Sequence, residues 1–232
     1  MKIEYLIFNL IVFSGPIFFG VQKKFNFRNK IPIALLSSLI SAIPFLIWDS
    51  LVTNIHWFFN EKYIIGIKFF GLPFEEILFF ISVPFACLFL WEMIVQNSKD
   101  KFFGNKFYYI ILTISFSIAA VYFFISGLIY TALVFSFLLI SVLVDNLSQK
   151  MLFSKNFAIF LAFVFIAFLI FNGYLTARPV LIYSERFITN IRITTIPVED
   201  IGYGFSLIYL ATKVYEKLKK KFNVRSETLF TE

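Results

Sequence analysis

The chain has 232 residues, of which 59% are hydrophobic and only 15% are charged. This composition is typical of a membrane protein and excludes a soluble domain built around one apolar core. The net charge of +7 is explained by basic loops that orient membrane spans and attract anionic lipid. Nucleic-acid binding is not indicated, because the sequence has no aromatic–basic binding module.

Seven predominantly apolar stretches have lengths near the roughly 17–25 residues that cross a bilayer. In chain order they cover residues 5–21, 31–48, 73–95, 107–125, 127–144, 156–172 and 197–215. We interpret the first stretch as a span and not as a signal peptide, because no small-residue cleavage site follows it. The sequence therefore predicts an all-α polytopic membrane protein with about seven transmembrane helices.

Basic residues are distributed unevenly between the two ends of these spans. Six of the 21 lie on one side: Lys2, Lys62, Lys68, Arg178, Arg186 and Arg192. The other fifteen follow the first, third or fifth span, or lie at the end of the seventh span and in the basic C-terminal tail, which extends to Arg225. Because the more positive side faces the cytoplasm, we predict a multi-pass protein of the cell membrane with its N-terminus outside and its C-terminus cytoplasmic.

Cysteine and histidine are nearly absent from the sequence. Cys87 and His56 are the single residues of their kinds, which excludes a disulfide framework and a metal site built from several such ligands. The nine glycines form neither a dinucleotide-binding nor a P-loop signature. We therefore expect neither a metal nor another cofactor.

Two copies of the motif Pro-x-Glu-Glu/Asp, at residues 73–76 and 197–200, stand 124 residues apart. An ungapped comparison of residues 61–92 with residues 185–216 gives eight identities. The identical pairs are Glu61/Glu185, Ile64/Ile188, Ile67/Ile191, Pro73/Pro197, Glu75/Glu199, Ile77/Ile201, Ser82/Ser206 and Glu92/Glu216. Charged residues and proline, which make up half of these pairs, rarely match by chance in apolar sequence. We interpret the pattern as an internal duplication.

The duplication divides the chain into three regions. Residues 1–105 form the first repeat, residues 106–126 a linker helix, and residues 127–232 the second repeat with its basic cytoplasmic tail. Three spans followed by one linker span leave both repeats in the same orientation, so we predict parallel three-helix repeats. We expect both motifs to serve one cavity that is open to lipid, near the outer ends of the third and seventh spans.

The four motif acids, Glu75, Glu76, Glu199 and Asp200, are the candidate catalytic residues. Proline followed by acidic residues is also an ordinary helix start, since proline needs no hydrogen-bond acceptor there and acids complement the helix dipole. However, acids that begin an apolar membrane helix usually face the bundle interior and mark a functional site. Both acids are duplicated here, and we therefore favour a functional role.

These residues resemble the heterodimer-type lycopene beta-cyclases of carotenoid synthesis, in a fused form. The resemblance rests on residues 72–80, Trp48, Trp57, Gly66, Trp91-Glu92, residues 172–176, Tyr183, Arg192, residues 196–200 and Tyr203-Gly204. It covers nearly the whole chain, and each half corresponds to one small subunit of the family; Arg178 departs from the small residue expected there. The resemblance implies cyclisation of the linear ends of lycopene to beta-rings, through gamma-carotene to beta-carotene, without net oxidation. The partners it implies are lycopene, the lipid bilayer and other carotenoid enzymes.

Closing a ring at the end of a polyene requires a strong acid, surroundings that tolerate a carbocation, and a base. Two neighbouring carboxyls can supply acid and base, because burial and a nearby carboxylate favour the protonated form, whereas a helix N-terminus or a cation favours the ionised form. We assign the acid to Glu75 or Glu199, and the base or charge stabiliser to Glu76 or Asp200.

Aromatic residues near the acids are candidates for substrate binding. Phe79, Phe80 and Tyr203 lie one helical turn from the motif acids, and their rings can stabilise a cation. The hydroxyl of Tyr203 can also donate a hydrogen bond to Glu199. Packing is the default role for the phenylalanines, since the chain contains 35 of them.

Four polar residues are supporting candidates. Lys68 and Arg192 precede the motif prolines by five residues and can hold an ionised carboxylate or extend to the membrane interface. Asn172 and Thr176 can orient an acid or cap the end of the sixth span. Glu92, like its equivalent in the second repeat, lies about 25 Å along the helix from the motif and is interpreted as an interfacial anchor.

Other functions fit parts of the same pattern. A related cyclase that forms epsilon rings or acts on longer carotenoids would carry the same motifs. A proton-coupled membrane transporter would also use paired intramembrane acids. A retinal-binding receptor would need a lysine in the middle of the last span, where residues 206–208 contain none.

Overall fold

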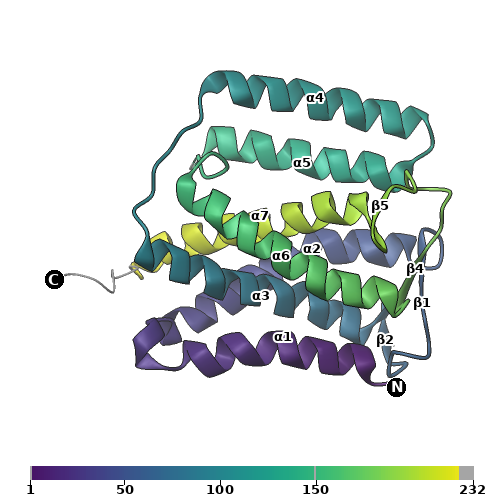
Figure 1. Ribbon diagram of the computed structural model, residues 1–232, viewed down its shortest axis with the longest axis horizontal. Coiled ribbons are helices and arrows are strands. Elements are labelled where there is room, and N and C mark those ends of the chain that lie inside the picture. Colours follow the sequence, from purple (N-terminus) through teal and green to yellow (C-terminus); the bar gives the residue numbers. More distant parts are fainter. Residues whose placement is uncertain (1, 149, 225–232) are drawn as a thin grey trace. The chain divides into compact units, whose positions relative to one another are not determined.

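The computed structural model describes residues 2–148 and 150–224 and is dominated by long helices (Figure 1). The α-helices in this part of the chain are α1 (Glu4–Gly20), α2 (Ile31–Val52), α3 (Phe74–Asn97), α4 (Lys106–Ile125), α5 (Ile129–Leu147), α6 (Lys155–Ala177) and α7 (Val198–Lys221). Two 3-10 helices, η1 (Lys23–Phe25) and η2 (Arg28–Lys30), connect α1 to α2. Arg225, in the predicted basic tail, lies outside the described residues.

Five helical segments are long and apolar enough to cross a membrane, which confirms the predicted class of helical membrane protein. They are Arg28–Val52, Phe74–Asn97, Lys106–Ile125, Ile129–Leu147 and Lys155–Ala177. The helix α1 is also apolar but has only 17 residues. The helix α7 has 24 residues and three lysines in its last turn.

Several helices continue beyond the predicted spans. The helices α2, α6 and α7 end at Val52, Ala177 and Lys221, where the sequence predicted spans ending at residues 48, 172 and 215. The additional turns contain polar residues such as Asp49, Thr176 and Lys217. These residues lower the local hydropathy without stopping a helix, so hydropathy underestimates the helix length.

The chain forms two compact units. Unit 1 contains α1, α2, α3 and the second half of α7, from Leu210 onward. Unit 2 contains Ile55–Phe58, α4, α5, α6 and the first half of α7, up to Tyr209. The single helix α7 thus contributes to both units.

In unit 1, α1 and α2 both pack against α3. The helix α2 contributes a row of small buried residues, which includes Ala34, Ser37, Ser38 and Ser41. The hydroxyls of Ser37 and Ser38 donate to the carbonyls of residues one turn earlier. Both hydroxyls therefore keep a hydrogen-bond partner although they are buried. Small residues of this kind allow membrane helices to approach closely.

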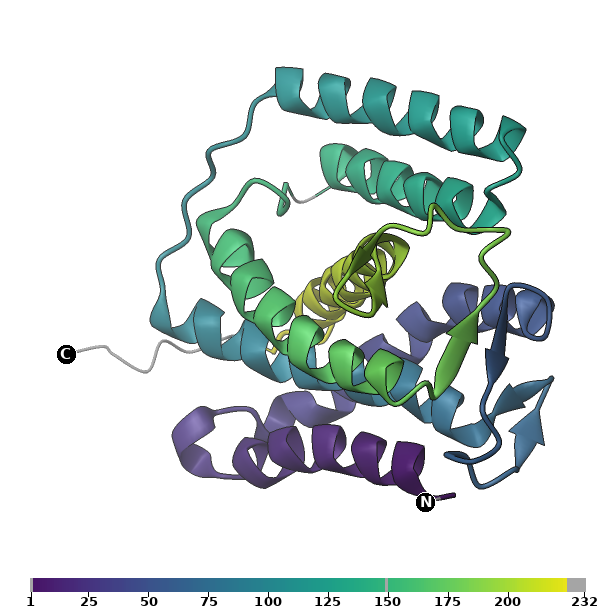
Figure 2. The same cartoon turned by 45° about the vertical axis from the view of Figure 1, so that its right-hand side comes forward.

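In unit 2, α4 lies alongside α5 (Figures 1 and 2), and the start of α7 is packed against α5 and α6. A Cβ at Gly202 would lie 2.5 Å from Cγ1 of Val134 on α5, and one at Gly204 would lie 3.6 Å from the ring of Phe168 on α6. Gly202 in particular leaves room for α5 beside the first turns of α7.

Short hairpins precede α3 and α7, and the sequence analysis did not predict them. The strand β2 (Lys68–Phe69) pairs with β3 (Leu72–Pro73), and β5 (Arg192–Ile193) pairs with β6 (Ile196–Pro197). Both pairs are antiparallel and have the same register, with Lys68 opposite Pro73 and Arg192 opposite Pro197. A third two-stranded sheet joins β1 (Trp57–Phe59) to β4 (Leu181–Tyr183).

Each motif therefore follows the same chain path. The backbone N–H of Phe74 donates to the carbonyl of Ile67 at 2.9 Å, and the N–H of Val198 donates to that of Ile191 at 3.0 Å. In both repeats the proline ends the hairpin and the next residue begins the helix. The equivalent bonds are 124 residues apart, which agrees with the duplication in the sequence.

Candidate active site

The motif acids lie in the first turns of α3 and α7 and are buried. The exposed fraction is 0% for Glu75, 6% for Glu76, 3% for Glu199 and 7% for Asp200. An acid that only complements a helix dipole can remain exposed, because the dipole acts at the helix surface. Burying a carboxyl costs free energy unless hydrogen bonds compensate. The burial of all four therefore indicates more than helix capping.

Glu75 and Glu199 are held in the same way. The backbone N–H of Ile65 donates to Oε1 of Glu75 at 2.6 Å, and that of Thr189 donates to Oε1 of Glu199 at 2.7 Å. In each glutamate Oε2 is buried and has no hydrogen-bond partner among the described residues. In each of these carboxyls a backbone N–H thus fixes one oxygen, and the other oxygen is not engaged by any hydrogen-bond donor of the described residues.

Glu199 is more firmly held than Glu75. Its Oε1 also accepts hydrogen bonds from the hydroxyls of Thr131, at 2.8 Å, and Thr189, at 2.7 Å. Near Glu75, Asn9 of α1 instead donates to the backbone carbonyl of Glu75 at 3.0 Å and accepts from Ser82 at 2.8 Å. The two sites are therefore similar but not identical.

The second acid of each motif accepts a hydrogen bond from a tyrosine. The hydroxyl of Tyr5 donates to Oε2 of Glu76 at 2.7 Å, and that of Tyr130 donates to Oδ1 of Asp200 at 2.9 Å. Oδ2 of Asp200 also accepts from Tyr183 at 2.6 Å and from Asn172 at 3.2 Å. Three donors on one carboxyl suit its ionised form, which can only accept.

Sequence reasoning missed Tyr5 and Tyr130 as site residues. Both lie in the first turn of the first helix of their repeat, and their backbone N–H groups donate to the carbonyls of Tyr63 and Phe187. The carbonyl residues are 124 positions apart, whereas the tyrosines are 125 apart. An ungapped comparison therefore cannot align the tyrosines, and a comparison that allowed one gap before the hairpins would have found them.

Aromatic rings surround the Asp200 site. The ring of Trp57 contacts Tyr130 edge-on with centroids 5.1 Å apart, and Tyr203 contacts Tyr130 at 5.7 Å. The rings of Tyr130 and Tyr183 are stacked with centroids 6.4 Å apart. Tyr203, a predicted site residue, thus lies beside the tyrosine that donates to Asp200.

The two predicted phenylalanines of the first motif have different surroundings. Phe79 packs near Tyr5, with ring centroids 6.3 Å apart, and so lies beside the donor to Glu76. Phe80 is buried and stacks on Phe45 at 6.3 Å, as expected for a packing residue.

The supporting polar candidates are only partly brought to the acids. Asn172 donates to Asp200, whereas Thr176 bonds to the carbonyl of Asn172 inside α6, at 3.0 Å, and to Thr195. Lys68 forms an exposed ion pair with Glu61 at 2.6 Å.

Arg192 lies against the ring of Tyr183, a tyrosine of the Asp200 site. Its guanidinium donates to the carbonyl of Thr195 at 2.9 Å and lies 5.9 Å from the ring centre of Tyr183. The hydroxyl of Tyr183 is the group that donates to Asp200.

The single histidine lies outside the acid sites. His56 precedes β1 and stacks on Phe187 with ring centroids 4.0 Å apart. It is buried, and this burial lowers the pKa of His56. Within residues 2–148 and 150–224, no group of three or more His, Cys, Asp or Glu residues could hold a metal ion.

Buried acid pairs at the starts of apolar helices, present in two similar copies, define a helical membrane protein with a duplicated carboxyl site. The sequence model of one family, described as lycopene cyclase, matches residues 3–94 and 127–218. The chain therefore belongs to the lycopene cyclase family. Each matched segment contains one motif, and α4 lies between them. No curated protein and no solved structure matches the chain.

Family membership places the chain among the enzymes of carotenoid cyclisation. The expected substrate is thus a lipophilic carotenoid, and the apolar helices agree with a multi-pass membrane protein. The two matched segments also agree with the fused, two-repeat form that the sequence predicted.

Proposed function

We propose that this chain is a lycopene beta-cyclase that closes a beta-ring at each linear end of lycopene, giving gamma-carotene and then beta-carotene. The reaction needs no oxidant or reductant. The observation that carries this proposal is the pair of buried carboxyls in each repeat. In each pair the glutamate has one buried oxygen with no hydrogen-bond partner among the described residues, and the second acid accepts a hydrogen bond from a tyrosine.

The proposed acid is the protonated carboxyl of Glu75 or Glu199. Since the backbone N–H groups donate to Oε1, that oxygen acts as the carbonyl oxygen and the proton belongs on Oε2. A proton on Oε2 has no competing acceptor among the described residues, so it is available to an alkene. It adds to one carbon of the terminal double bond, and a tertiary carbocation forms at the other carbon.

Ring closure and proton loss complete the reaction. The electron pair of a nearby double bond forms the new carbon–carbon bond, and the positive charge moves into the ring. Loss of a ring proton then forms the double bond of the beta-ring, so that one proton is gained and one is lost. We assign the stabilisation of the charge, or the removal of this proton, to Glu76 and Asp200.

The aromatic residues beside the acids fit a cationic intermediate. The faces of Tyr130, Tyr203 and Trp57 near Asp200, and of Phe79 near Glu76, can stabilise positive charge without reacting with it. An apolar site also limits the access of water, which would otherwise capture the carbocation.

We further propose that α1 and α7 cross the membrane like the five longer apolar segments, giving two parallel three-helix repeats joined by α4. The length of α1 is at the lower end of the range of roughly 17–25 residues, and the lysines of α7 are confined to its second half. The distribution of basic residues supports an outside N-terminus and a cytoplasmic C-terminus.

Expression of the full chain in a lycopene-accumulating bacterium tests the proposed activity. We expect chromatography of the extracted pigments to show that lycopene is replaced by beta-carotene, with gamma-carotene as the intermediate. Pigment that remains lycopene, although the protein is detected in the membrane, would contradict the proposal and favour a proton-coupled transporter. Epsilon-ring products would correct the ring type only.

A further inference from the structure

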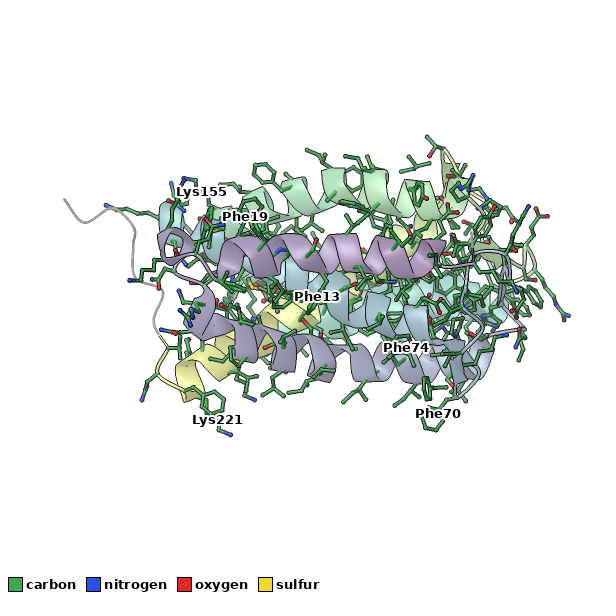
Figure 3. All side chains as sticks on the ribbon, turned by 90° about the horizontal axis from the view of Figure 1, so that it is seen from below. Phe13, Phe19, Phe70, Phe74, Lys155 and Lys221 are labelled. Atoms are coloured by element: carbon green, nitrogen blue, oxygen red, sulfur yellow. The ribbon has the colours of Figure 1, made fainter. Side chains whose placement is uncertain are left out.

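Unit 1 contains a second group of charged and polar residues, most of them buried, at the end opposite to its motif. Figure 3 shows Phe19 and Lys221 at one end of this unit and Phe70 and Phe74 at the other. The group lies at the lysine end and consists of the buried residues Lys30, Trp91, Glu92, Gln96, Tyr215 and Lys219, together with Glu216, whose side chain is 20% exposed. We call these residues the ion network.

Glu92 is the centre of the ion network and is 0% exposed. It forms ion pairs with Lys30 of η2 and Lys219 of α7, each at 2.8 Å. It also accepts hydrogen bonds from Tyr215 at 2.9 Å and from Gln96 at 3.1 Å. The interpretation of Glu92 as an interfacial anchor was therefore wrong, because apolar periodicity cannot reveal which cations the folded chain brings to it.

The helices α3 and α7 contribute to the network through equivalent positions. Trp91 of α3 donates to Glu216 of α7 at 2.8 Å, and Tyr215 of α7 donates to Glu92 of α3. Trp91 and Tyr215 are 124 residues apart, as are Glu92 and Glu216. The duplication has thus produced a reciprocal contact between the helices that carry the two motifs.

The charges of the network balance. Lys219 also pairs with Glu216 at 3.0 Å, so that two lysines face two glutamates. Removing one member of a buried ion pair leaves a charge that neither water nor a partner compensates. The second half of α7 therefore has one favourable rotation and one favourable axial position against α3, since residues 215 and 219 lie one turn apart.

We propose that the ion network is a positioning device for the cyclisation reaction, an inference that rests on the proposed function. The network is too far from the motifs to touch the substrate there, because Glu92 and Glu216 each follow a motif glutamate by 17 residues, or about 25 Å of helix. However, α3 and α7 are continuous helices. Within one helix the rotation of the second half sets the direction of the side chains on the first turn, so holding each second half restrains the motif carboxyl of that same helix. Small errors in such geometry cost large factors in rate.

Replacing Glu92 and then restoring the charge balance tests this inference. Glu92→Gln leaves the buried Lys30 and Lys219 with one glutamate, the partly buried Glu216, and we expect kcat per folded enzyme to fall by about tenfold with little change in KM. In Glu92→Gln/Lys30→Met the remaining Lys219–Glu216 pair is neutral, and kcat should return to within about threefold of the parent value. Glu185→Gln, at an exposed acid of the second repeat, is the matched control and should behave as the parent.

Each outcome separates the two proposals. If the parent protein forms no cyclised product, both the proposed function and this inference are contradicted. If the parent is active and Glu92→Gln keeps its kcat, or the second substitution fails to restore it, only the positioning role is overturned.

If Glu92→Gln does not accumulate in the membrane, the variant Tyr215→Phe tests the inference instead, because it removes one hydrogen bond and leaves the charges balanced. We expect it to lower kcat by roughly threefold, and an unchanged kcat would overturn the inference.

Discussion

Glu75→Gln and Glu199→Gln are each expected to lower the turnover of lycopene by at least about 100-fold, the usual effect of losing a general acid. The carboxamide keeps the shape of the side chain, and its oxygen can still accept from the backbone N–H of residue 65 or 189. However, an amide cannot deliver a strong-acid proton from the position of Oε2. The measurement is initial rate per unit of membrane-inserted protein.

The control for these variants is again Glu185→Gln, which changes the same chemical group at an exposed site. The variants Glu76→Gln and Asp200→Asn belong in the same series, because the base or charge-stabilising role predicts that they also lose activity. If either Glu75→Gln or Glu199→Gln kept near-parental turnover, the motif concerned would be a helix start without a catalytic acid.

In intact cells, cysteines introduced on the outer face of the membrane are expected to be labelled, and a cysteine on the cytoplasmic face is expected to remain unlabelled. In a background lacking Cys87, cysteines at Asn60 and Ser184 should both react with an impermeant thiol reagent applied to intact cells. A cysteine at Lys220, an exposed position near the end of α7, should react only after the cells are opened. The proposed parallel repeats would place the loops before both motifs on one face, and the orientation proposed from the excess of lysine would place the end of α7 in the cytoplasm.

The possible outcomes distinguish the repeat from its orientation. Reaction of only one of the cysteines at Asn60 and Ser184 would contradict the parallel repeats. Reaction at Lys220 alone would leave the repeats intact and reverse the protein in the membrane. Labelling of the opened cells serves as the control that each cysteine is accessible at all.

Much of the fold could be predicted because hydropathy and duplication act over long stretches of sequence. The seven predicted spans all correspond to helices, and a helix, α4, was expected within residues 106–126; its role as a linker between repeats stays a prediction. The hairpins before Pro73 and Pro197 could not be predicted, because their strands have only two residues each. Such strands depend on the backbone hydrogen bonds of the folded chain and not on a periodic pattern.

The candidate site was predictable where side chains in one motif define it. Proline and the acids identified Glu75, Glu76, Glu199 and Asp200, and the structure buries all four. The donors to these acids come from other helices and from the backbone, as for Tyr5 and the N–H of Ile65. A backbone donor has no side-chain signature, so no sequence pattern could reveal it.

The proton that starts ring closure can be followed directly. Membranes containing the protein are equilibrated in deuterated water and given less lycopene than enzyme, so that each active site turns over once. Acid initiation by an exchangeable carboxyl predicts a single deuterium atom in each new ring, with no consumption of a reductant. It should lie on the carbon next to the dimethyl carbon, which was the hydrogen-bearing carbon of the former terminal double bond. Rings that form without deuterium, or lycopene that remains unchanged in the presence of the inserted protein, would contradict acid-initiated cyclisation by the duplicated carboxyl site.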